Sequence, residues 1–421
     1  MSHAPRIRTV LSCTLLVVSL GAAATACGSS GSNPLSASPF DADDSISFNG
    51  PQGNGKADPD KPLEVTSKDD DGRITDVTAT DSTGRQLAGE LSADGTRWHS
   101  TAPLAAGVHY TVRVATEDED GAPGGRTMGF DTAPASHRLN VTFGPKRGEY
   151  GVGQPVTAQL SAPIKDKAAR AQVERALKVD SVPAADGAWY WVDSRTLHYR
   201  PKEYWPAHAT ISVHSNLNGI KVSDKLYGGA AKPLKLRTGD RLEAITDASA
   251  HEMTVKRDGQ VINTIPVTTG KPGFSTRNGV KVVLGKTYFV RMTSSSIGIA
   301  AGSSDSYDLP VYYATQVTLS GEYVHAAPWS EGSQGSANTS HGCTGMSTGN
   351  AEWFFNHVRQ GDIVKVVGSD GDTMTPFDNG YGDWNLSWAK WAKGSALTDG
   401  KQNPGGTDAP AQTARLRPAA L

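Results

Sequence analysis

The sequence predicts a mainly β protein made of several sandwich modules. Its 421 residues include 46 glycines and 24 prolines, while aromatic residues make up 7% and charged residues 20%. This composition has too many turn formers for a coiled coil or a helical bundle, and it lacks the acidic excess of a disordered chain. The length indicates about two to four domains. Short alternating strands, separated by turn signals every 8–12 residues or so, are typical of β-sandwiches.

The first 26 residues have the three-part pattern of a secretory signal peptide. Arg6 and Arg8 form a short basic region, an apolar stretch covers residues 10–20, and small residues follow as far as Ala26. The apolar stretch is too short for a convincing membrane-spanning helix. We therefore expect residues 1–26, including Cys13, to be removed from the mature protein.

Cys27 comes directly after Ala24-Thr25-Ala26, and this arrangement resembles a bacterial lipobox in which Ala24 replaces the usual leucine. A free thiol exposed outside the cell would be a liability. We therefore expect Cys27 to carry lipid and to anchor the protein at the extracytoplasmic face of the cell membrane, in the cell wall space. The alternative is ordinary signal cleavage nearby, which would leave Cys27 free.

The segment after Cys27 is expected to be a linker that leads into a first β module. Residues 27–50 are rich in serine, glycine, alanine, aspartate and proline, as in flexible linkers. Residues 51–136 contain alternating runs at 74–80 and 110–116, with turn dipeptides such as Asp94-Gly95 between them. This spacing predicts an immunoglobulin-like β-sandwich.

Residues 137–240 continue the β pattern and predict a second immunoglobulin-like sandwich of similar size. One helix, at 166–177, interrupts the pattern. The two modules show no close sequence repeat. The expected strands of the second module are residues 139–143, 153–160, 188–192, 196–200 and 210–213.

Residues 241–370 form a third β-rich unit in this interpretation. A hairpin is expected at 255–265, because Asp258-Gly259 is a strong turn dipeptide between two alternating runs. One short helix is expected at 351–358. The remaining expected strands are residues 280–284, 287–292, 316–319 and 361–367.

The C-terminal part is expected to be a Trp-rich subdomain at 371–393 and a disordered tail at 394–421. Trp384, Trp388 and Trp391 are spaced by four and three residues, which predicts an aromatic stripe on one face of a helix. Such a stripe usually packs against the protein and does not form a binding site. The tail is rich in glycine, proline, alanine and threonine.

The net charge argues against nucleic-acid binding, and the cysteine content argues against a disulfide-stabilised fold. The formal net charge of −2 does not provide the clustered basic residues that nucleic acids require. The three cysteines are too few, and odd in number, for a disulfide framework. Because Cys13 and Cys27 belong to the processed N-terminus, Cys343 needs an explanation of its own.

Cys343 has the neighbours that a cysteine nucleophile needs. His325 and His341 are available as bases that take up and return a proton near neutral pH. The successive main-chain amides of His341, Gly342 and Cys343 are candidate donors to the oxyanion of a tetrahedral intermediate. Two alternatives remain open from chemistry alone: a buried unreactive thiol, and a zinc site, for which the spacing is unusual and a fourth ligand is missing.

The stretch from Tyr323 to Phe355 resembles the catalytic core of L,D-transpeptidases, the YkuD-type domain. The resemblance rests on an upstream histidine, His325, and on the signature Ser340-His341-Gly342-Cys343. The flanking sequence is similar to that of long members from high-GC Gram-positive bacteria. Those members are tethered to the membrane and carry two immunoglobulin-like modules before the catalytic domain.

The resemblance implies a role for each residue of the motif. Cys343 is the acylated nucleophile, and His325 is the base, held by the main-chain carbonyl of Ala326. His341 shapes the site and its oxyanion donors. The residues expected to line the donor pocket are Met292, Tyr307, Trp329 and Ser340.

Two features depart from the family pattern. Thr344-Gly345 stand where the family often has an aliphatic residue followed by arginine or asparagine, so a polar contact to substrate is missing at Gly345. Residues 307–313 also look shorter than the lid-like loop of related enzymes, which would expose the site more.

The resemblance implies a cofactor-free acyl transfer in peptidoglycan synthesis and cell wall biogenesis, with no metal involved. The enzyme would take a tetrapeptide stem as donor, release D-Ala and form a 3→3 cross-link with a second stem. Its expected partners are peptidoglycan stem peptides, the membrane through the lipid anchor, and carbapenems as acylating inhibitors. The alternatives are an L,D-carboxypeptidase that uses the same thioester, and a wall-binding lipoprotein with a decayed catalytic domain.

Overall fold

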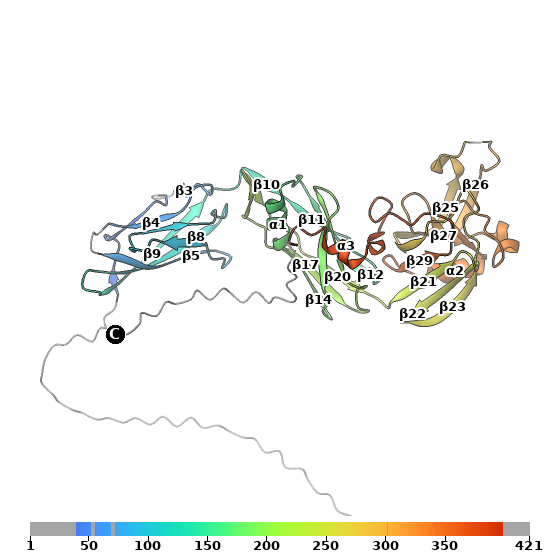
Figure 1. Cartoon of the computed structure of the whole chain (residues 1–421), viewed down its shortest axis with the longest axis horizontal. Helices are drawn as coiled ribbons and strands as arrows, with labels where there is room; N and C mark the ends of the chain where they lie inside the picture. Colours follow the sequence, from blue (N-terminus) through green and yellow to red (C-terminus); the bar gives the residue numbers. More distant parts are fainter. Residues whose placement is uncertain (1–38, 52–54, 69–71, 301, 399–421) are drawn as a thin grey trace, which may run out of the picture.

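A computed structural model describes residues 39–51, 55–68, 72–300 and 302–398. Three β-rich modules follow one another along the long axis of the molecule (Figure 1). The fold is mainly β, as the composition and the strand pattern predicted. The predicted signal peptide, the predicted lipid site at Cys27 and the part of the predicted tail beyond residue 398 lie outside the described residues. The prediction of a disordered tail from residue 394 was wrong for its first residues, because the carbonyl of Gly394 accepts from the amide of Trp191 at 3.1 Å and the amide of Ala396 donates to Glu174 at 2.8 Å. None of the helices in the described ranges has the length and apolar character that crossing a membrane requires.

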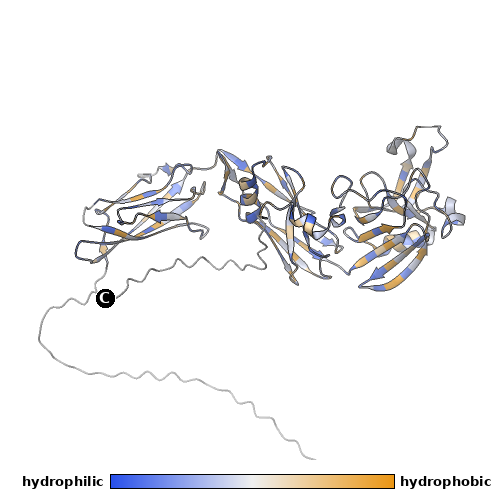
Figure 2. Cartoon of the chain, viewed as in Figure 1, coloured by the Kyte–Doolittle hydropathy of each residue, from blue (hydrophilic) through white to orange (hydrophobic). Residues whose placement is uncertain are grey.

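The first module is a sandwich of two sheets around the core residues Ile46, Val65, Trp98 and Val112. Buried and exposed residues alternate along its long strands, as expected for a sheet with one face in the core. Figure 2 shows hydrophobic and hydrophilic residues interspersed along these strands. One sheet has the order β1-β9-β8-β5, with β3 beside β9, and the other has the order β2-β4-β7-β6. The strands are β1 Phe40–Asp41, β2 Ile46–Phe48, β3 Lys56–Ala57, β4 Glu64–Ser67, β5 Arg73–Asp81, β6 Gly89–Leu91, β7 Arg97–Ser100, β8 His109–Glu117 and β9 Pro123–Thr132.

The prediction of a flexible linker as far as residue 50 was wrong for its last part. The first module begins with strands β1 and β2, and β1 starts at Phe40, before the expected boundary at residue 51. Ala42 and Ile46 are almost completely buried in its core. The polar residues around them hide this contribution in the sequence, because each strand supplies only one or two apolar side chains.

The second module is a sandwich of the sheets β11-β13-β16-β15 and β12-β20-β17-β14, with a small sheet β10-β19-β18 beside it. The predicted helix is α1 Lys167–Ala176, which begins where the side chain of Asp166 accepts a hydrogen bond from the Ala169 amide. The expected strand at 139–143 is divided in two at Asn140. The strands are β10 His137–Leu139, β11 Val141–Gly144, β12 Gly148–Tyr150, β13 Val156–Leu160, β14 Leu177–Val182, β15 Gly187–Trp191, β16 Thr196–Pro201, β17 Thr210–Ser215, β18 Lys221–Ser223, β19 Leu226–Gly228 and β20 Leu234–Thr238.

The third module combines the sheets β23-β22-β21-β29-β24 and β25-β26-β27-β28 with one helix, α2 Thr348–His357. The predicted hairpin at 255–265 is present as β22 and β23, with Asp258-Gly259 as its turn. The predicted helix at 351–358 begins earlier, because Ser347 caps it. The strands are β21 Leu242–Asp247, β22 Glu252–Arg257, β23 Gln260–Pro266, β24 Gly279–Val282, β25 Gly285–Thr293, β26 Asp308–Gln316, β27 Tyr323–Ala326, β28 Thr344–Met346 and β29 Ile363–Val367.

Two sequence interpretations in this module are corrected. The segment 307–313, interpreted as a lid-like loop, is mostly the start of strand β26, which pairs with β25 along nearly its whole length. The strand expected at 316–319 was wrong beyond Gln316, the last residue of β26, because a turn follows in which the amides of Val317 and Thr318 both donate to the carbonyl of Glu322. In the β25–β26 hairpin, the main-chain amides and carbonyls of this segment form hydrogen bonds between the two strands.

The tryptophan stripe is not on a single helix. Trp384 lies in the 3-10 turn η3 Asp383–Asn385, whereas Trp388 and Trp391 lie in the separate helix α3 Trp388–Ala392. The interpretation as packing agrees with the structure, because these rings surround the buried guanidinium of Arg200 in the second module. The C-terminal segment therefore joins the third module to the second.

Further contacts reinforce this joint. His198 Nδ1 in the second module lies 2.8 Å from Oδ1 of the fully buried Asp383. Arg200 donates to the carbonyl of Leu386 at 2.8 Å. The indole of Trp391 donates to the carbonyl of Ala188 at 2.9 Å.

We expect Arg200→Met to weaken the joint between these modules. The substitution leaves the Leu386 carbonyl without its donor and removes the cation from the tryptophan rings, at a cost of about 2–4 kcal/mol. Urea unfolding followed by circular dichroism should show the first transition at lower urea. Arg175→Met, at an exposed position of α1, is the matched control and should change stability by about 0.5 kcal/mol or less. Equal midpoints for the two variants would contradict this role for Arg200.

Candidate active site

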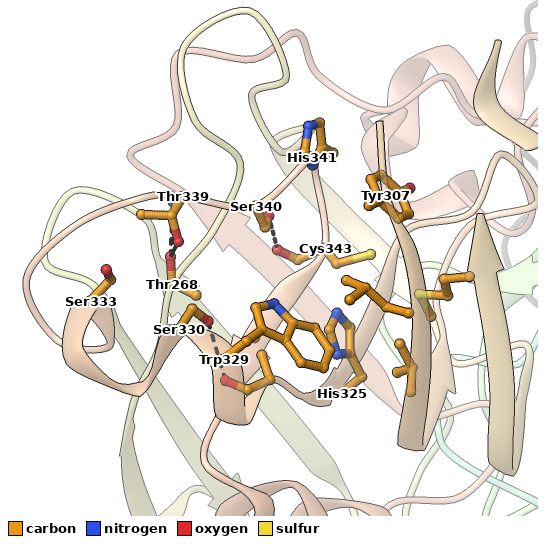
Figure 3. A pocket seen from close by; sticks show the side chains of 15 residues that line it. Thr268, Tyr307, His325, Trp329, Ser330, Ser333, Thr339, Ser340, His341 and Cys343 are labelled. Atoms are coloured by element: carbon orange, nitrogen blue, oxygen red, sulfur yellow. Dashed lines mark hydrogen bonds between the residues drawn. The ribbon is translucent and has the colours of Figure 1, made fainter. Parts of the chain in front are cut away.

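A pocket of about 380 Å³ opens on the third module, between the β25–β26 hairpin and the segment that carries the cysteine motif (Figure 3). The structure brings most of the sequence-predicted site residues together on its wall. These residues are Cys343, His325, His341, Met292, Tyr307, Trp329 and Ser340.

Strand pairing places the nucleophile beside its base. His325 lies on β27, and Cys343 directly precedes β28. The two strands are parallel neighbours, with Val324 opposite Thr344 and His325 opposite Gly345. The register therefore brings residues 325 and 343 into one pocket although 17 residues separate them in the chain.

The ring of His325 is held in one orientation and one tautomer. Its Nδ1 lies 2.7 Å from the carbonyl oxygen of Ala326. A carbonyl can only accept a hydrogen bond, so Nδ1 carries the proton and Nε2 is free to take one. Burial lowers the pKa of His325, and the indole of Trp329 stacks over the imidazole with a centroid separation of 6.0 Å. His325 is therefore a neutral base at neutral pH.

The thiol of Cys343 is neutral in the resting site. It donates a weak hydrogen bond to the carbonyl of Gly321 at 3.5 Å. Desolvation by the surrounding side chains raises the pKa of Cys343 to about 11, although the amide of Tyr323 and the charge of Lys281 favour the thiolate. Attack on a substrate therefore requires transfer of the thiol proton to His325 as the new bond forms.

His341 shapes the site from the side of the hairpin. Its ring packs edge-on against Phe274 and tilted against Tyr307, with centroid separations of 4.6 Å and 5.0 Å. Its Nε2 lies 3.6 Å from Oδ1 of Asp305, which is also paired with Lys271 at 2.5 Å. Burial and the charge of Lys271 lower the pKa of His341. Asp305, which precedes the hairpin strand β26, could not be recognised as a site residue from the sequence.

One of the three predicted oxyanion donors is already engaged. The amide of Gly342 donates to the hydroxyl oxygen of Ser340 at 3.1 Å, and this hydroxyl donates to the carbonyl of Cys343 at 2.6 Å. Gly342 has a φ of 116°, a conformation that side chains rarely allow. Ser340 thus ties the cysteine turn together, and the amides of His341 and Cys343 remain as candidate oxyanion donors.

Gly345 is explained by close packing. A Cβ atom at this position would lie 2.9 Å from Cβ of Ala327 and 3.1 Å from a methyl carbon of Thr268. The family's larger polar residue therefore has no space here. Hydroxyl groups stand on this side of the pocket instead, from Thr268, Ser330, Ser333 and Thr339 (Figure 3).

The sequence reasoning also missed the apolar wall of the pocket. Leu309 and Val311 from β26 face it together with Met292 from β25. The signal was the two-residue alternation at 309 and 311, which a lid-like interpretation of the segment concealed. Among the described residues, no group of three or more histidine, cysteine or acidic side chains is placed to hold a metal ion.

Family models and curated proteins are similar to this chain over most of its length. The model described as L,D-transpeptidase catalytic domain (YkuD) matches residues 242–366, and the model described as bacterial Ig domain matches residues 54–221. L,D-transpeptidase 2 of Mycobacterium tuberculosis is 36% identical over 338 residues, which is 80% of this chain and 81% of that protein. L,D-transpeptidase 5 of the same organism is 33% identical over 80% of this chain and 74% of that protein.

Solved structures are similar to about half of the chain. An LD transpeptidase in complex with imipenem is 38% identical and covers 54% of this chain and 99% of that one, with a TM-score of 0.48. L,D-transpeptidase 3 of Mycobacterium tuberculosis in complex with a faropenem-derived adduct is 34% identical and covers 53% of this chain and 96% of that one, with a TM-score of 0.45.

The neutral resting thiol predicts the pH dependence of Cys343 alkylation. Below its pKa of about 11, the thiolate fraction grows with pH, so the iodoacetamide rate should rise about tenfold per unit between pH 7 and 9. Mass spectrometry of the Cys343 peptide would follow the reaction. Glutathione, an ordinary thiol, serves as the control and should begin to level off near pH 9. A plateau for Cys343 below pH 8 would instead indicate a thiolate paired with a charged His325.

Proposed function

The chain belongs to the L,D-transpeptidase family, and we propose that it forms 3→3 cross-links in peptidoglycan by acyl transfer through Cys343. The observation that carries this proposal is the position of His325. Its Nδ1 is tied to a carbonyl and its Nε2 is free, in the same pocket as the only cysteine of the described residues. This arrangement supplies both the nucleophile and the proton carrier that acyl transfer needs.

The first half-reaction would release D-Ala. The sulfur of Cys343 attacks the carbonyl between the L-centre of diaminopimelate and the terminal D-Ala of a donor stem, while the thiol proton moves to Nε2 of His325. The free main-chain amides of the cysteine turn stabilise the oxyanion. The C–N bond then breaks, His325 returns the proton to the leaving amine, and a thioester remains on Cys343.

The second half-reaction would form the cross-link. The side-chain amine of a second stem attacks the thioester, and His325 takes the proton that the amine loses. The C–S bond breaks, and the proton returns to the sulfur of Cys343. Nε2 of His325 accepts a proton and returns it in both half-reactions. The hydrogen bond from Nδ1 to the Ala326 carbonyl keeps Nε2 available for this role.

The pocket walls suggest how the donor stem lies. Met292, Leu309 and Val311 offer an apolar wall for the aliphatic part of the stem. The hydroxyls on the opposite side can bind its amide groups, in place of the polar side chain that is absent at Gly345. Neither an L,D-carboxypeptidase nor a decayed lipoprotein is needed to account for this site.

Carbapenems should acylate the same cysteine. A β-lactam carbonyl is attacked in the same way, but its amine stays attached after the ring opens, so no leaving group departs. The relatives in complex with imipenem and with a faropenem-derived adduct support this extension. We expect a mass increase on Cys343 equal to the whole inhibitor.

The N-terminal sequence supports a location outside the cell. The signal peptide pattern and the lipobox-like Cys27 suggest a lipoprotein held at the outer face of the cell membrane. The two β-sandwich modules stand in line before the catalytic module and would act as a stalk that places it within the wall (Figure 1).

We expect Cys343→Ala to abolish cross-linking while the protein still folds. On disaccharide-tetrapeptide, the parent should give a dimer that lacks one D-Ala, and the variant should be slower by about a thousandfold or more. Mass spectrometry of the products measures this. Ser336→Ala, at an exposed position, is the matched control and should behave like the parent. Dimer formation by Cys343→Ala would contradict the proposal, and trimmed tripeptide without dimer from the parent would indicate a carboxypeptidase.

We expect Cys27→Ser to release the protein into the culture medium of a bacterial host, because the serine cannot carry the thioether-linked lipid. The parent should remain with the membrane fraction and enter the detergent phase on phase separation. Cys13→Ser changes the other N-terminal cysteine and should leave the protein membrane-bound. Retention of Cys27→Ser on the membrane would exclude lipid anchoring at this residue.

A further inference from the structure

A buried ion pair lies next to the nucleophile. The Nζ of Lys281, on β24, is 2.5 Å from Oε2 of Glu322, and only 1% of the Lys281 side chain is exposed. Glu322 is also buried, in the turn between β26 and β27. Burying two charges is costly, and a buried pair often stabilises a fold no better than two apolar side chains would. The stability of the fold therefore does not explain this pair, and its position next to Cys343 suggests another role.

Every polar group of Glu322 is used to hold the turn. Its Oε1 accepts hydrogen bonds from the main-chain amide and from Nη1 of Arg277, each at 3.1 Å. Its amide donates to the hydroxyl of the buried Thr318 at 2.8 Å, and its carbonyl accepts from the amides of Val317 and Thr318. The pair thus fixes the turn to β24 from inside the module.

The two residues that flank Glu322 both act on the sulfur of Cys343. The carbonyl of Gly321 accepts the hydrogen bond from the thiol, and the main-chain amide of Tyr323 lowers the pKa of Cys343 and so favours the thiolate. Glu322 also lies close to the cysteine motif, since a Cβ atom added to Gly342 would be in van der Waals contact with its Cγ, at 3.8 Å. The side chain that holds the turn therefore also lies beside the loop that carries the nucleophile.

We propose that Lys281 and Glu322 are positioning residues for Cys343: their buried pair holds the turn 317–322 so that the Gly321 carbonyl and the Tyr323 amide face the sulfur. The inference rests on the proposed use of Cys343 as nucleophile. The carbonyl orients the thiol before the reaction, and the amide stabilises the sulfur as its proton moves to His325. Neither Lys281 nor Glu322 touches the substrate in this role.

The charge of Glu322 and its positioning role predict opposite effects on the reactivity of Cys343, so the two can be distinguished by experiment. The titratable groups around Cys343 are His325 and Tyr323 from β27, His341 in the cysteine motif, Tyr307 directly before β26, Glu322 in the turn and Lys281 on β24. The negative charge of Glu322 raises the pKa of the thiol. If that charge were its only influence, Glu322→Gln would make Cys343 more reactive. If Glu322 positions the turn, the same variant must make Cys343 less reactive.

The experiment compares Glu322→Gln with the parent in the full chain. In the variant the side chain has a single oxygen and no charge, so it can accept from Lys281 or from Arg277 but not from both, and the turn loses part of its anchor. We expect imipenem acylation of Cys343 to slow by about tenfold or more, and the pH profile of its alkylation to move to higher pH. Glu243→Gln is the matched control, because Glu243 pairs with Arg241 in the same module outside the pocket. The control should keep the rate and profile of the parent.

If Glu322→Gln folds poorly, a second variant separates the loss of stability from the loss of positioning. Lys281→Met/Glu322→Leu replaces the pair with apolar side chains of similar shape, which buried pairs often tolerate. We expect its melting temperature to return toward that of the parent while acylation stays slow. Parent-like acylation in either variant, or a profile shifted to lower pH, would overturn the proposal. If imipenem does not acylate the parent, the proposed function fails, while the alkylation profiles still decide the role of the pair.

Discussion

The parallel pairing of β27 with β28 is the constraint on which the site depends. It sets His325 opposite Gly345, two residues beyond Cys343, so the positions of base and nucleophile follow from main-chain hydrogen bonds. A shift of one residue would turn the imidazole to the other face of the sheet. The close fit of Gly345 against Ala327 and Thr268 restricts such a shift, because any Cβ at this position would clash. The residue that departs from the family pattern thus supports the register of the reactive pair.

Desolvation then determines the state of that pair. Burial raises the pKa of Cys343 and lowers the pKa of His325, so both groups rest in their neutral forms. Moving a proton between neutral neighbours creates two opposite charges in a poorly solvated pocket, which is costly unless donors already point at them. The Tyr323 amide and the Ala326 carbonyl face the sulfur and Nδ1, respectively. The main chain therefore supplies much of the polarity that the reaction needs.

Short sequence patterns correctly predicted the features that depend only on neighbouring residues. The helix at 166–177, the turn at Asp258-Gly259 and the Ser340–Cys343 motif could be predicted, because each depends on residues that are close together in the sequence. The early strands β1 and β2, the pairing of β26 with β25 and the separation of Trp384 from α3 depend on partners far along the chain. The contact of Lys281 with Glu322 spans 41 residues. No pattern in the sequence indicates that this lysine and this glutamate are buried together, so this part of the site could not be predicted.

The architecture also couples the stalk to the chemistry. The second and third modules are joined through main-chain bonds from Gly151 to Gln360 and from Gly153 to Gly361, and through the tryptophans around Arg200. Residues 360 and 361 lie just before β29, which begins at Ile363, and β29 lies between β21 and β24 in the sheet. Because Lys281 lies on β24, the second module is one strand away from the ion pair behind Cys343. The second module thus braces the sheet that supports the nucleophile, in addition to extending the chain toward the wall.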